Sequence, residues 1–259
     1  MSALVRYAVE RSVARLTLDS PDNRNALSTA LLDQLHQGLT DATEEAGVRA
    51  IVLGHTGGTF CAGADLAQAS AGGSGADPGD VAVERARELT HLLRRILTLP
   101  IPVIAAVDGH VRAGGLGLVG ACDIAVAGSA STFALTEARI GVAPSIISLT
   151  LLPKMTSRAA SRYFLTGEKF GAAEAADIGL ITIAADDVEA TVASLTAAMG
   201  KASPQGLAAS KALTTAAILE AFDRQADELT EQSARLFVSD EAREGMMAFL
   251  QKRPPHWAG

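Results

Sequence analysis

Two clusters of small residues follow apolar runs and together could bind one ligand atom. The first, at 60–65, reads Phe-Cys-Ala-Gly-Ala-Asp and comes after the apolar run 51–53. The second, at 113–117, reads Ala-Gly-Gly-Leu-Gly and comes after the apolar run 102–107. Small residues let backbone N–H groups approach a ligand closely, and two such donors stabilise an oxyanion. Either cluster alone is typical of an ordinary tight turn, but the pair predicts an oxyanion site.

Further short motifs accompany these clusters along the chain. They are Asn-Arg-Asn-Ala-Leu at 23–27, Phe-Cys-Ala-Gly-Ala-Asp-Leu at 60–66, Pro-Val-Ile-Ala-Ala-Val-Asp-Gly at 102–109, Ala-Cys-Asp-Ile at 121–124, Phe-Ala-Leu-Thr-Glu at 133–137 and the tail 240–255. In this order they resemble the crotonase (enoyl-CoA hydratase/isomerase) superfamily. The resemblance runs over nearly the whole chain, and it is far more specific to the superfamily than to one reaction.

The resemblance implies chemistry on a coenzyme A thioester. Removing a proton next to a thioester leaves negative charge on the carbonyl oxygen, which two backbone N–H groups can hold. By resemblance these belong to Ala64 and Gly114. Glu137 is the candidate acid/base, because it follows apolar residues on a short helical turn where burial would raise its pKa. The alternatives are purely structural glycines and a surface Glu137 paired with Arg139.

The chain departs from the archetype at one position. Archetypal hydratases carry another glutamate about twenty residues before the one matching Glu137, and Gly117 stands there. A water or a branched acyl chain could fill the space beside this glycine. The segment 140–148 also lacks the glycine-rich version common in the family. It resembles the branched-chain, methylglutaconyl-CoA hydratase-like subgroup.

Coenzyme A needs cations for its phosphates and backbone groups for its other parts. The resemblance assigns this role to one set of residues, namely Arg24, Ala26, Ala62, Asp65, Leu66, Phe249 and Lys252. The last two match tail positions that reach a neighbouring subunit's coenzyme A in the family, although Lys252 could equally end a solvated helix. No cofactor beyond coenzyme A, as part of the substrate, is expected.

Apolar periodicity predicts an α/β fold with helices towards the C-terminus. The expected strands lie at 4–9, 13–18, 50–53, 102–107, 122–127 and near 179–183, and the expected helices begin after Ser28 and near Leu89 and lie at 188–199, 204–219, 222–237 and 239–251, with a mobile loop at 72–79. By resemblance this is a spiral of ββα turns, residues 1–200, followed by a helical region, 201–259, that forms trimers. The stripe Met246, Phe249 and Leu250 is either a subunit contact or intrachain core.

Several function classes are disfavoured. The net charge of −7 and the absence of a basic stripe argue against nucleic acid. The run Gly115–Gly120 spells G-x-G-x-x-G, but the next strand-like run begins two residues later, so no crossover helix for a dinucleotide is expected. No metal-ligand spacing exists.

Cys61 and Cys122 are expected to be reduced and buried. The N-terminus shows no leader and no apolar run spans a membrane, which predicts a cytoplasmic protein.

Three functions follow as hypotheses. The first is an enoyl-CoA hydratase, a lyase with Glu137 as its single acid/base. The second is a Δ3,Δ2-enoyl-CoA isomerase, in which the same glutamate moves a proton along the acyl chain. The third is a coenzyme A-ester-binding protein without turnover. If Glu137 is not the base, a water held by Ser145, Ser148 or His110 is the alternative. A polar structural role is expected for His110 and Arg112 beside the second cluster.

Overall fold

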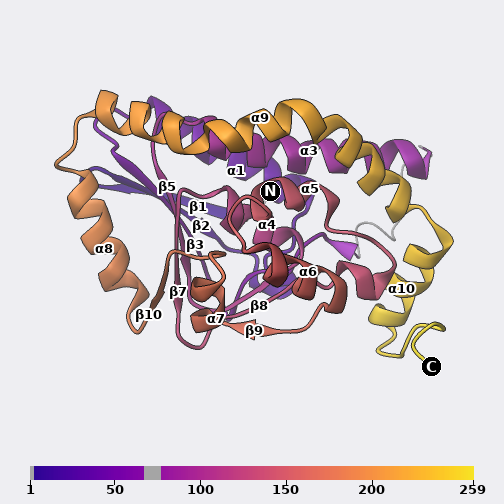
Figure 1. Cartoon of the computed structure of the whole chain (residues 1–259). Coiled ribbons are helices and arrows are strands. Elements are labelled where there is room, and N and C mark those ends of the chain that lie inside the picture. Colours follow the sequence, from indigo (N-terminus) through magenta and orange to yellow (C-terminus); the bar gives the residue numbers. More distant parts are fainter. Residues whose placement is uncertain (1–2, 67–76) are drawn as a thin grey trace.

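The computed structural model describes residues 3–66 and 77–259 (Figure 1). Their strands form a six-stranded sheet in the order β1-β2-β3-β5-β7-β10 and a four-stranded sheet in the order β4-β6-β8-β9. The large sheet comprises β1 (Val5–Glu10), β2 (Val13–Leu18), β3 (Ala50–His55), β5 (Val103–Val107), β7 (Ile124–Gly128) and β10 (Ile183–Ala185). The small sheet comprises β4 (Thr59–Cys61), β6 (His110–Arg112), β8 (Thr132–Ala134) and β9 (Phe170–Gly171).

The chain alternates between the two sheets in a repeated ββα order. β3, β5 and β7 lie in the large sheet, and each is followed at once by a short strand of the small sheet, respectively β4, β6 and β8. A helical segment then returns the chain to the large sheet, where β3, β5 and β7 pair in parallel. The returning segments are α3 (Pro78–Thr98) and α4 (Gly114–Ala121). After β8 the chain passes through η2 (Glu137–Ile140), α5 (Ser145–Leu151), α6 (Ser157–Thr166), β9 and α7 (Ala172–Asp177) before it reaches β10. The expected spiral of ββα turns is therefore confirmed.

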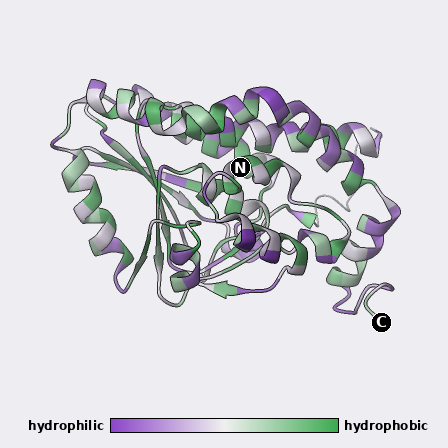
Figure 2. Cartoon of the chain, viewed as in Figure 1, coloured by the Kyte–Doolittle hydropathy of each residue, from purple (hydrophilic) through white to green (hydrophobic). Residues whose placement is uncertain are grey.

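Both faces of β3, β5 and β7 are buried, which explains why these three strands read as continuous apolar runs. Ile51, Leu53 and Ala105 face the main core, whereas Val52 and Ile104 face a second cluster under α8 (Val188–Met199). Figure 2 shows the hydrophobic residues gathered in the strands and the hydrophilic ones along the second half of α9. Alternate side chains of one strand thus reach opposite faces.

The first helix begins where the sequence predicts. α1 (Thr29–Glu44) starts after Ser28, whose Oγ accepts a hydrogen bond from the Leu31 N–H at 3.3 Å. Such a side chain satisfies one of the N–H groups that the first helical turn leaves unpaired. The inward face of α1 carries buried leucines at the expected positions, namely Leu31, Leu32, Leu35 and Leu39.

The C-terminal region differs from the prediction of three helices. α9 (Pro204–Phe237) is one helix of 34 residues, because the residues at 219–222 (Leu-Glu-Ala-Phe) contain neither proline nor glycine to interrupt it. It lies alongside α3 across the top of the molecule in Figure 1. α10 (Asp240–Leu250) follows after Ser239, which caps it. The division at residue 200 into two domains stays a prediction.

Two other element predictions were wrong in position. β10 begins at Ile183, because Gly179 has a φ of +86° and ends the turn after α7 (Ala172–Asp177). Of the expected mobile loop, residues 72–76 lie outside the described residues. Its end, Pro78, instead opens α3, with Asp77 as the cap. The remaining described element is η1 (Pro21–Asn23).

The second glycine cluster forms a helix rather than a turn. The eight residues of α4 begin two residues after β6 ends and stop three residues before β7 begins. The premise that no helix fits there was therefore wrong. Small residues made the stretch look like a loop, whereas close packing against α5 supplies the stability that its glycines lack.

Candidate active site

The small sheet brings the predicted catalytic residues to one edge. β4, β6 and β8 are parallel neighbours, with Cys61 opposite Val111 and Arg112 opposite Ala134. The chain leaves β4 towards Ala64, β6 towards Gly114 and β8 towards Glu137. Because parallel strands end at the same edge of a sheet, these three residues leave it side by side. Ligands of open α/β sheets bind beyond this carboxyl edge.

The two glycine-containing segments touch each other directly. A Cβ atom placed on Gly63 would lie 2.8 Å from Ala113 Cβ and 3.3 Å from the Gly114 nitrogen. A Cβ on Gly114 would lie 3.7 Å from Gly63 Cα. Both glycines are therefore required for the close approach, and the backbone amides of Ala64 and Gly114 come from adjoining segments. Neither amide donates a hydrogen bond within the described part of the chain.

The start of α4 favours negative charge. Gly114 is the first residue of the helix, so its N–H has no acceptor one turn earlier and lies at the positive end of the helix dipole. Ala113, before it, has φ +47° and ψ −123°, a conformation that usually requires glycine. Strained residues of this kind cluster at functional sites. The strain at Ala113 could not be predicted from the sequence, because nothing in the residue type signals it.

The segment 23–27 is fixed against the first glycine cluster. The Ala62 N–H donates to the Arg24 carbonyl at 3.1 Å, and the Leu27 N–H donates to the Gly63 carbonyl at 2.8 Å. Asn25 is fully buried, and its side-chain amide donates to the Thr56 carbonyl after β3 and to the Thr59 carbonyl at the start of β4. Five of the predicted coenzyme A-binding residues therefore lie together around this contact, namely Arg24, Ala26, Ala62, Asp65 and Leu66.

The other two predicted coenzyme A-binding residues lie at the opposite end of the chain. Phe249 is 61% exposed on the outer face of α10, and Lys252 follows that helix in a left-handed conformation. No contact of either side chain with the segment 23–27 is recorded among the described residues. The intrachain-core alternative for Phe249 and Leu250 was wrong, because both side chains are exposed.

Glu137 is a buried carboxyl without a charged partner. It is 7% exposed at the start of η2, and its Oε2 has no hydrogen-bond partner within the described residues. Burial raises the pKa of Glu137 to about 7, opposed by a hydrogen bond from its own backbone N–H. The alternative pairing with Arg139 was wrong, since the Arg139 Nε donates to the Thr166 carbonyl instead. A carboxyl with this pKa can both give and take a proton near neutral pH.

The space beside Gly117 is filled. A Cβ placed on Gly117 would lie 2.4 Å from Ile147 Cγ2 and 3.4 Å from Leu93 Cδ1. Ile147 is 3% exposed on α5, and the Thr150 hydroxyl donates to the Gly117 carbonyl at 3.2 Å. The expectation that water or an acyl chain fills this space was therefore wrong. Side-chain packing between α4 and α5 decides it, and no motif in the sequence places Ile147 opposite Gly117.

The remaining polar residues near the site have structural partners. Ser145 Oγ donates to Gln232 Oε1, and Ser148 Oγ donates to the Ser145 carbonyl. Arg112 donates to the Val111 and Thr132 carbonyls, and the His110 ring contacts the Thr132 hydroxyl at 2.9 Å. The structural role expected for His110 and Arg112 is confirmed.

The two cysteines are buried free thiols, as expected. Desolvation raises the pKa of both Cys61 and Cys122 to about 12, so neither is a nucleophile near neutral pH. Cys61 instead packs against the start of α4, because a Cβ on Gly115 would lie 2.8 Å from the Cys61 Cβ. It is a small apolar residue that lets the two glycine segments meet.

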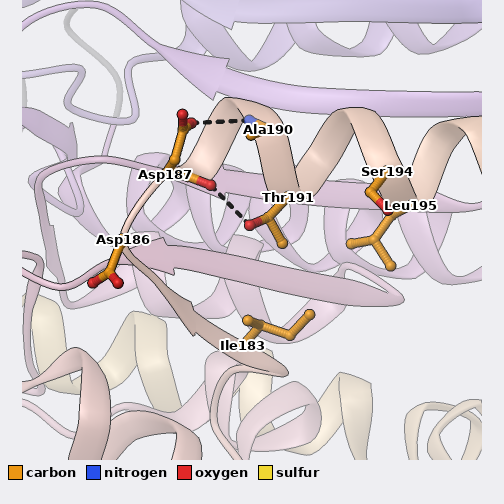
Figure 3. A pocket seen from close by; sticks show the side chains of 7 residues that line it. All are labelled: Ile183, Asp186, Asp187, Ala190, Thr191, Ser194 and Leu195. Carbon is orange, nitrogen blue, oxygen red and sulfur yellow. Dashed lines mark hydrogen bonds between the residues drawn. The ribbon is translucent and has the colours of Figure 1, made fainter.

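One depression of the surface lies away from this edge. It measures about 500 Å³, opens broadly to solvent between β10 and α8 (Figure 3), and is lined by seven residues, Ile183, Asp186, Asp187, Ala190, Thr191, Ser194 and Leu195. The Asp187 carboxylate there caps α8. None of these seven residues belongs to the small-sheet edge that carries the predicted site. Among the described residues no group of histidine, cysteine and carboxylate side chains could hold a metal ion, and no described helix could cross a membrane.

The fold and this edge define a class of protein, an α/β fold in which two adjoining glycine-containing segments and the buried carboxyl of Glu137 lie at the edge of a small sheet. Residues 8–259 match the family model described as enoyl-CoA hydratase/isomerase, and the chain belongs to that family. Its fold is the crotonase fold. A crystal structure of an enoyl-CoA hydratase from Mycobacterium avium is 66% identical, covers 100% of both chains and superposes with a TM-score of 0.91.

Two curated relatives show the range of reactions in the family. A Rhodobacter capsulatus protein named "Probable enoyl-CoA hydratase" is 35% identical over 98% of this chain and 98% of its own length. The 1,2-epoxyphenylacetyl-CoA isomerase of Escherichia coli is 30% identical over 100% of both. Similarity therefore establishes the family, while the choice between hydration and isomerisation depends on the site.

Proposed function

We propose that this protein adds water to a 2-enoyl-CoA. The N–H groups of Ala64 and Gly114 hold the thioester oxygen while the oxygen of water bonds to Cβ. The double-bond electrons move onto the thioester and form an enolate, whose charge the two N–H groups stabilise. Glu137 gives its proton to Cα, and its carboxylate recovers the proton that the adding water loses. Water is consumed, and no cofactor besides the substrate's own coenzyme A is needed.

One observation carries this proposal. Glu137, which has a pKa of about 7 and an unpartnered oxygen, follows β8. The next two strands of the same sheet, β6 and β4, lead to the unpaired backbone amides of Gly114 and Ala64. Burial keeps the acid form populated near neutral pH, where a solvated glutamate would be ionised. The same site therefore offers an acid, its conjugate base and an anion receptor, which is what stepwise addition to an enoyl thioester requires.

Arg24 and the segment around it form the proposed coenzyme A-binding region. Arg24 has an exposed side chain beside the contact between residues 23–27 and 61–65, so its guanidinium can reach a phosphate in solvent. Ala26, Ala62, Asp65 and Leu66 would supply backbone groups around it. Phe249 and Lys252 would act on the coenzyme A of a neighbouring subunit. Arg24→Ala should weaken acyl-CoA binding about tenfold, measured by calorimetry.

A second reaction is favoured by the packing at Gly117. Ile147 fills that space, so the position of the archetype's other glutamate offers room for neither a second acid nor a water. A single carboxyl suffices for a Δ3,Δ2-enoyl-CoA isomerase. Glu137 would take the proton from Cα of a 3-enoyl-CoA, the amides would hold the dienolate, and the same proton would return at Cγ. The double bond moves, and no atoms are gained or lost.

Purified protein assayed with three substrates separates these reactions. We expect crotonyl-CoA or a branched 2-enoyl-CoA to gain water, with loss of the enoyl absorbance. Conversion of a 3-enoyl-CoA to a conjugated 2-enoyl-CoA without hydration of either 2-enoyl substrate would establish the isomerase instead. Binding of all three without turnover would leave a coenzyme A-ester-binding protein. Mass spectrometry in ¹⁸O water provides the control, since only hydration incorporates solvent oxygen.

We also propose a homotrimer or a dimer of trimers, located in the cytoplasm, with no nucleic acid or membrane partner. The outer face of α10 supports the assembly, because Met247, Phe249 and Leu250 expose 45%, 61% and 50% of their surface. Apolar groups of this size seldom stay in water when a symmetric partner can cover them. Light scattering of the full chain should give three or six times its 26.6 kDa mass. A stable, active monomer would contradict the proposed assembly.

A further inference from the structure

α10 and the turn that carries Glu137 meet backbone to backbone. A Cβ placed on Gly245 would lie 2.5 Å from both the carbonyl carbon and the carbonyl oxygen of Ile140. From the other side, a Cβ on Gly141 would lie 2.6 Å from the Glu241 carbonyl carbon. Gly141 also has a φ of +76°, which favours glycine by itself. Each element therefore contributes one glycine at which no side chain fits.

The rest of α10 is built for this contact. Ala242 and Ala248 share the inner face with Gly245 and are almost fully buried. Beyond the helix the Arg253 guanidinium donates two hydrogen bonds to the Glu244 carboxylate, at 2.6 and 2.7 Å. This pair folds the last residues back onto α10 and holds the pKa of Glu244 down at about 2. The helix is thus capped by Ser239 at its start and clamped near its end.

The contact acts on the backbone of Glu137. The Glu137 carbonyl accepts from the Val142 N–H at 3.1 Å and from the Gly141 N–H, so these bonds close the turn against which α10 lies. Val142 is itself buried. The packing of α10 against Ile140 and Gly141 therefore fixes the turn whose first residue is Glu137. The Glu137 side chain adopts its position from that backbone.

Burial, rather than a charged neighbour, sets the proton affinity of Glu137. The charged groups of the packed elements η2, α6 and α10 have other partners. Arg139 donates to the Thr166 carbonyl, Arg162 pairs with Glu168 and Glu174, Arg243 pairs with Asp240, and Arg253 pairs with Glu244. Arg158 and Glu241 are the remaining charged side chains on these elements, and both are exposed. The buried Tyr163 of α6 donates its hydroxyl proton to Glu174. A change in how α10 lies on the turn should thus act through solvation.

We propose that Gly245 is a positioning residue for Glu137: its missing side chain lets α10 lie directly on the 137–141 turn and keep the carboxyl out of water. The inference rests on the proposed role of Glu137 as acid/base. It adds that the C-terminal helix of the same chain sets the proton affinity of that group. Gly245→Ala must move α10 away from Ile140, because the clash is with backbone atoms that cannot rotate aside.

The test is a titration of the Glu137 carboxyl without substrate. The infrared band of the protonated carboxyl, taken as the difference between wild type and Glu137→Gln, should titrate near pH 7. In Gly245→Ala we expect the midpoint about one unit lower, since partial exposure restores part of the solvation. Arg243→Gln, at an exposed side chain of the same helix that pairs with Asp240, is the matched control and should keep the wild-type midpoint. A wild-type midpoint in Gly245→Ala, with lower thermal stability, overturns the proposal.

Kinetics provide the second measurement. With whichever enoyl-CoA is turned over, kcat of Gly245→Ala should fall about ten- to hundredfold, while KM changes little because Ala64 and Gly114 are untouched. The acid limb of the pH profile should move with the infrared midpoint. If no acyl-CoA is turned over, the proposed function fails, yet the infrared shift still decides the role of Gly245.

Glu244→Gln covers the case in which Gly245→Ala does not fold. This substitution, at a partly exposed side chain, breaks the bidentate pair with Arg253 and loosens α10 without adding bulk. We expect a smaller infrared shift in the same direction. An unchanged midpoint in this folded variant overturns the proposal as well.

Discussion

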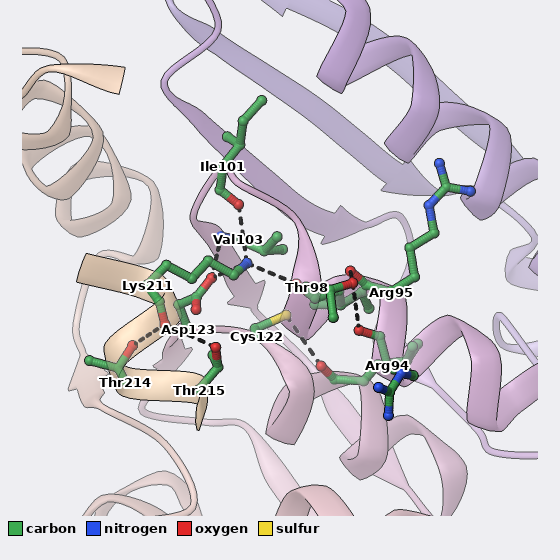
Figure 4. Close-up of polar contacts among 12 residues, drawn as sticks. Arg94, Arg95, Thr98, Ile101, Val103, Cys122, Asp123, Lys211, Thr214 and Thr215 are labelled. Atoms are coloured by element: carbon green, nitrogen blue, oxygen red, sulfur yellow. Dashed lines mark hydrogen bonds and ion pairs between the residues drawn. The ribbon is translucent and has the colours of Figure 1, made fainter. Parts of the chain in front are cut away.

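The buried carboxyl of Glu137 and the partly buried carboxylate of Asp123 have opposite surroundings. Asp123, just before β7, accepts hydrogen bonds on Oδ2 from Lys211 Nζ at 2.8 Å and from the Val103 N–H at 2.7 Å (Figure 4). Lys211 of α9 also donates to the Ile96 and Ile101 carbonyls. Glu137 has no ion pair at all within the described residues. Each carboxylate leaves one oxygen without a partner, but only the charge of Asp123 is neutralised nearby.

The surroundings of Asp123 are those of a structural group, whereas those of Glu137 fit its proposed catalytic role. A buried ion pair with further hydrogen bonds joins elements at little net gain, and its loss from one side is costly. A buried carboxyl without a cation is held at an unusual pKa, which is typical of catalytic groups. Lys211 thus ties α9 to the strands β5 and β7, whereas the isolation of Glu137 fits the proposed role, in which its proton passes to a substrate.

Glu137→Gln should produce the largest effect. Losing a general acid/base costs about 10²–10⁴-fold in turnover, while acyl-CoA affinity should stay close to wild type because the amides and Arg24 remain. Steady-state kinetics with the best enoyl-CoA and calorimetry with a saturated acyl-CoA measure the two quantities. Glu168→Gln, which changes an exposed carboxylate, is the control. Near-wild-type rates in Glu137→Gln would mean that another group moves the proton.

Lys211→Met should have the largest effect on stability. The Lys211 side chain is 3% exposed, so the change leaves the Asp123 charge buried without its partner. We expect the free energy of unfolding to fall by about 3–5 kcal/mol, measured by urea denaturation. Asp123→Asn combined with Lys211→Met should recover part of that loss. Equal losses in the single and double variants would show that the ion pair itself is not the cause.

The pH dependence of the free energy of unfolding should report the burial of Glu137. Burial raises the folded-state pKa of Glu137 to about 7 from 4.5, so between these values the folded state binds more protons than the unfolded state. Stability contributed by this group is therefore complete below pH 4.5 and falls as the pH rises to 7, by about 3 kcal/mol.

Unfolding free energies of wild type and Glu137→Gln measured from pH 5 to pH 8 check this slope. The variant should lack the loss, so the difference between the two proteins should change in favour of the variant as the pH rises. Other titrating groups are common to both and cancel. A constant difference across the range would place the Glu137 pKa near its ordinary value.

Much of this site could be predicted from the sequence, for identifiable reasons. Backbone donors need small residues, so Ala64 and Gly114 lie in readable clusters, and the strands before them read as apolar runs. Burial of Glu137 followed from Phe133 and Leu135. These are local signals, in which the residues that carry the information are neighbours along the chain.

What the sequence could not show depends on distant contacts. Ile147 lies thirty residues after Gly117, and only the packing of α5 on α4 brings them together. Gly245 gains its meaning from Ile140, over a hundred residues earlier. The length of α9 was missed because periodicity alone does not say that two helical stretches are continuous. Packing partners at long separation leave no local pattern.

Gly117→Glu places a third carboxyl in the core and gives the smallest expected effect on turnover. Because a side chain there meets Ile147 and Leu93, we expect overpacking to cost about 1–3 kcal/mol, rather than the gain of hydratase activity that an empty space would allow. Ile147→Ala opens the space at the cost of a cavity. The double variant should be more stable than the sum of the two losses predicts, by about 1 kcal/mol or more. Strict additivity in urea denaturation would show that Ile147 does not determine what fits beside Gly117, and faster hydration in the double variant would show that the packing had excluded a second carboxylate.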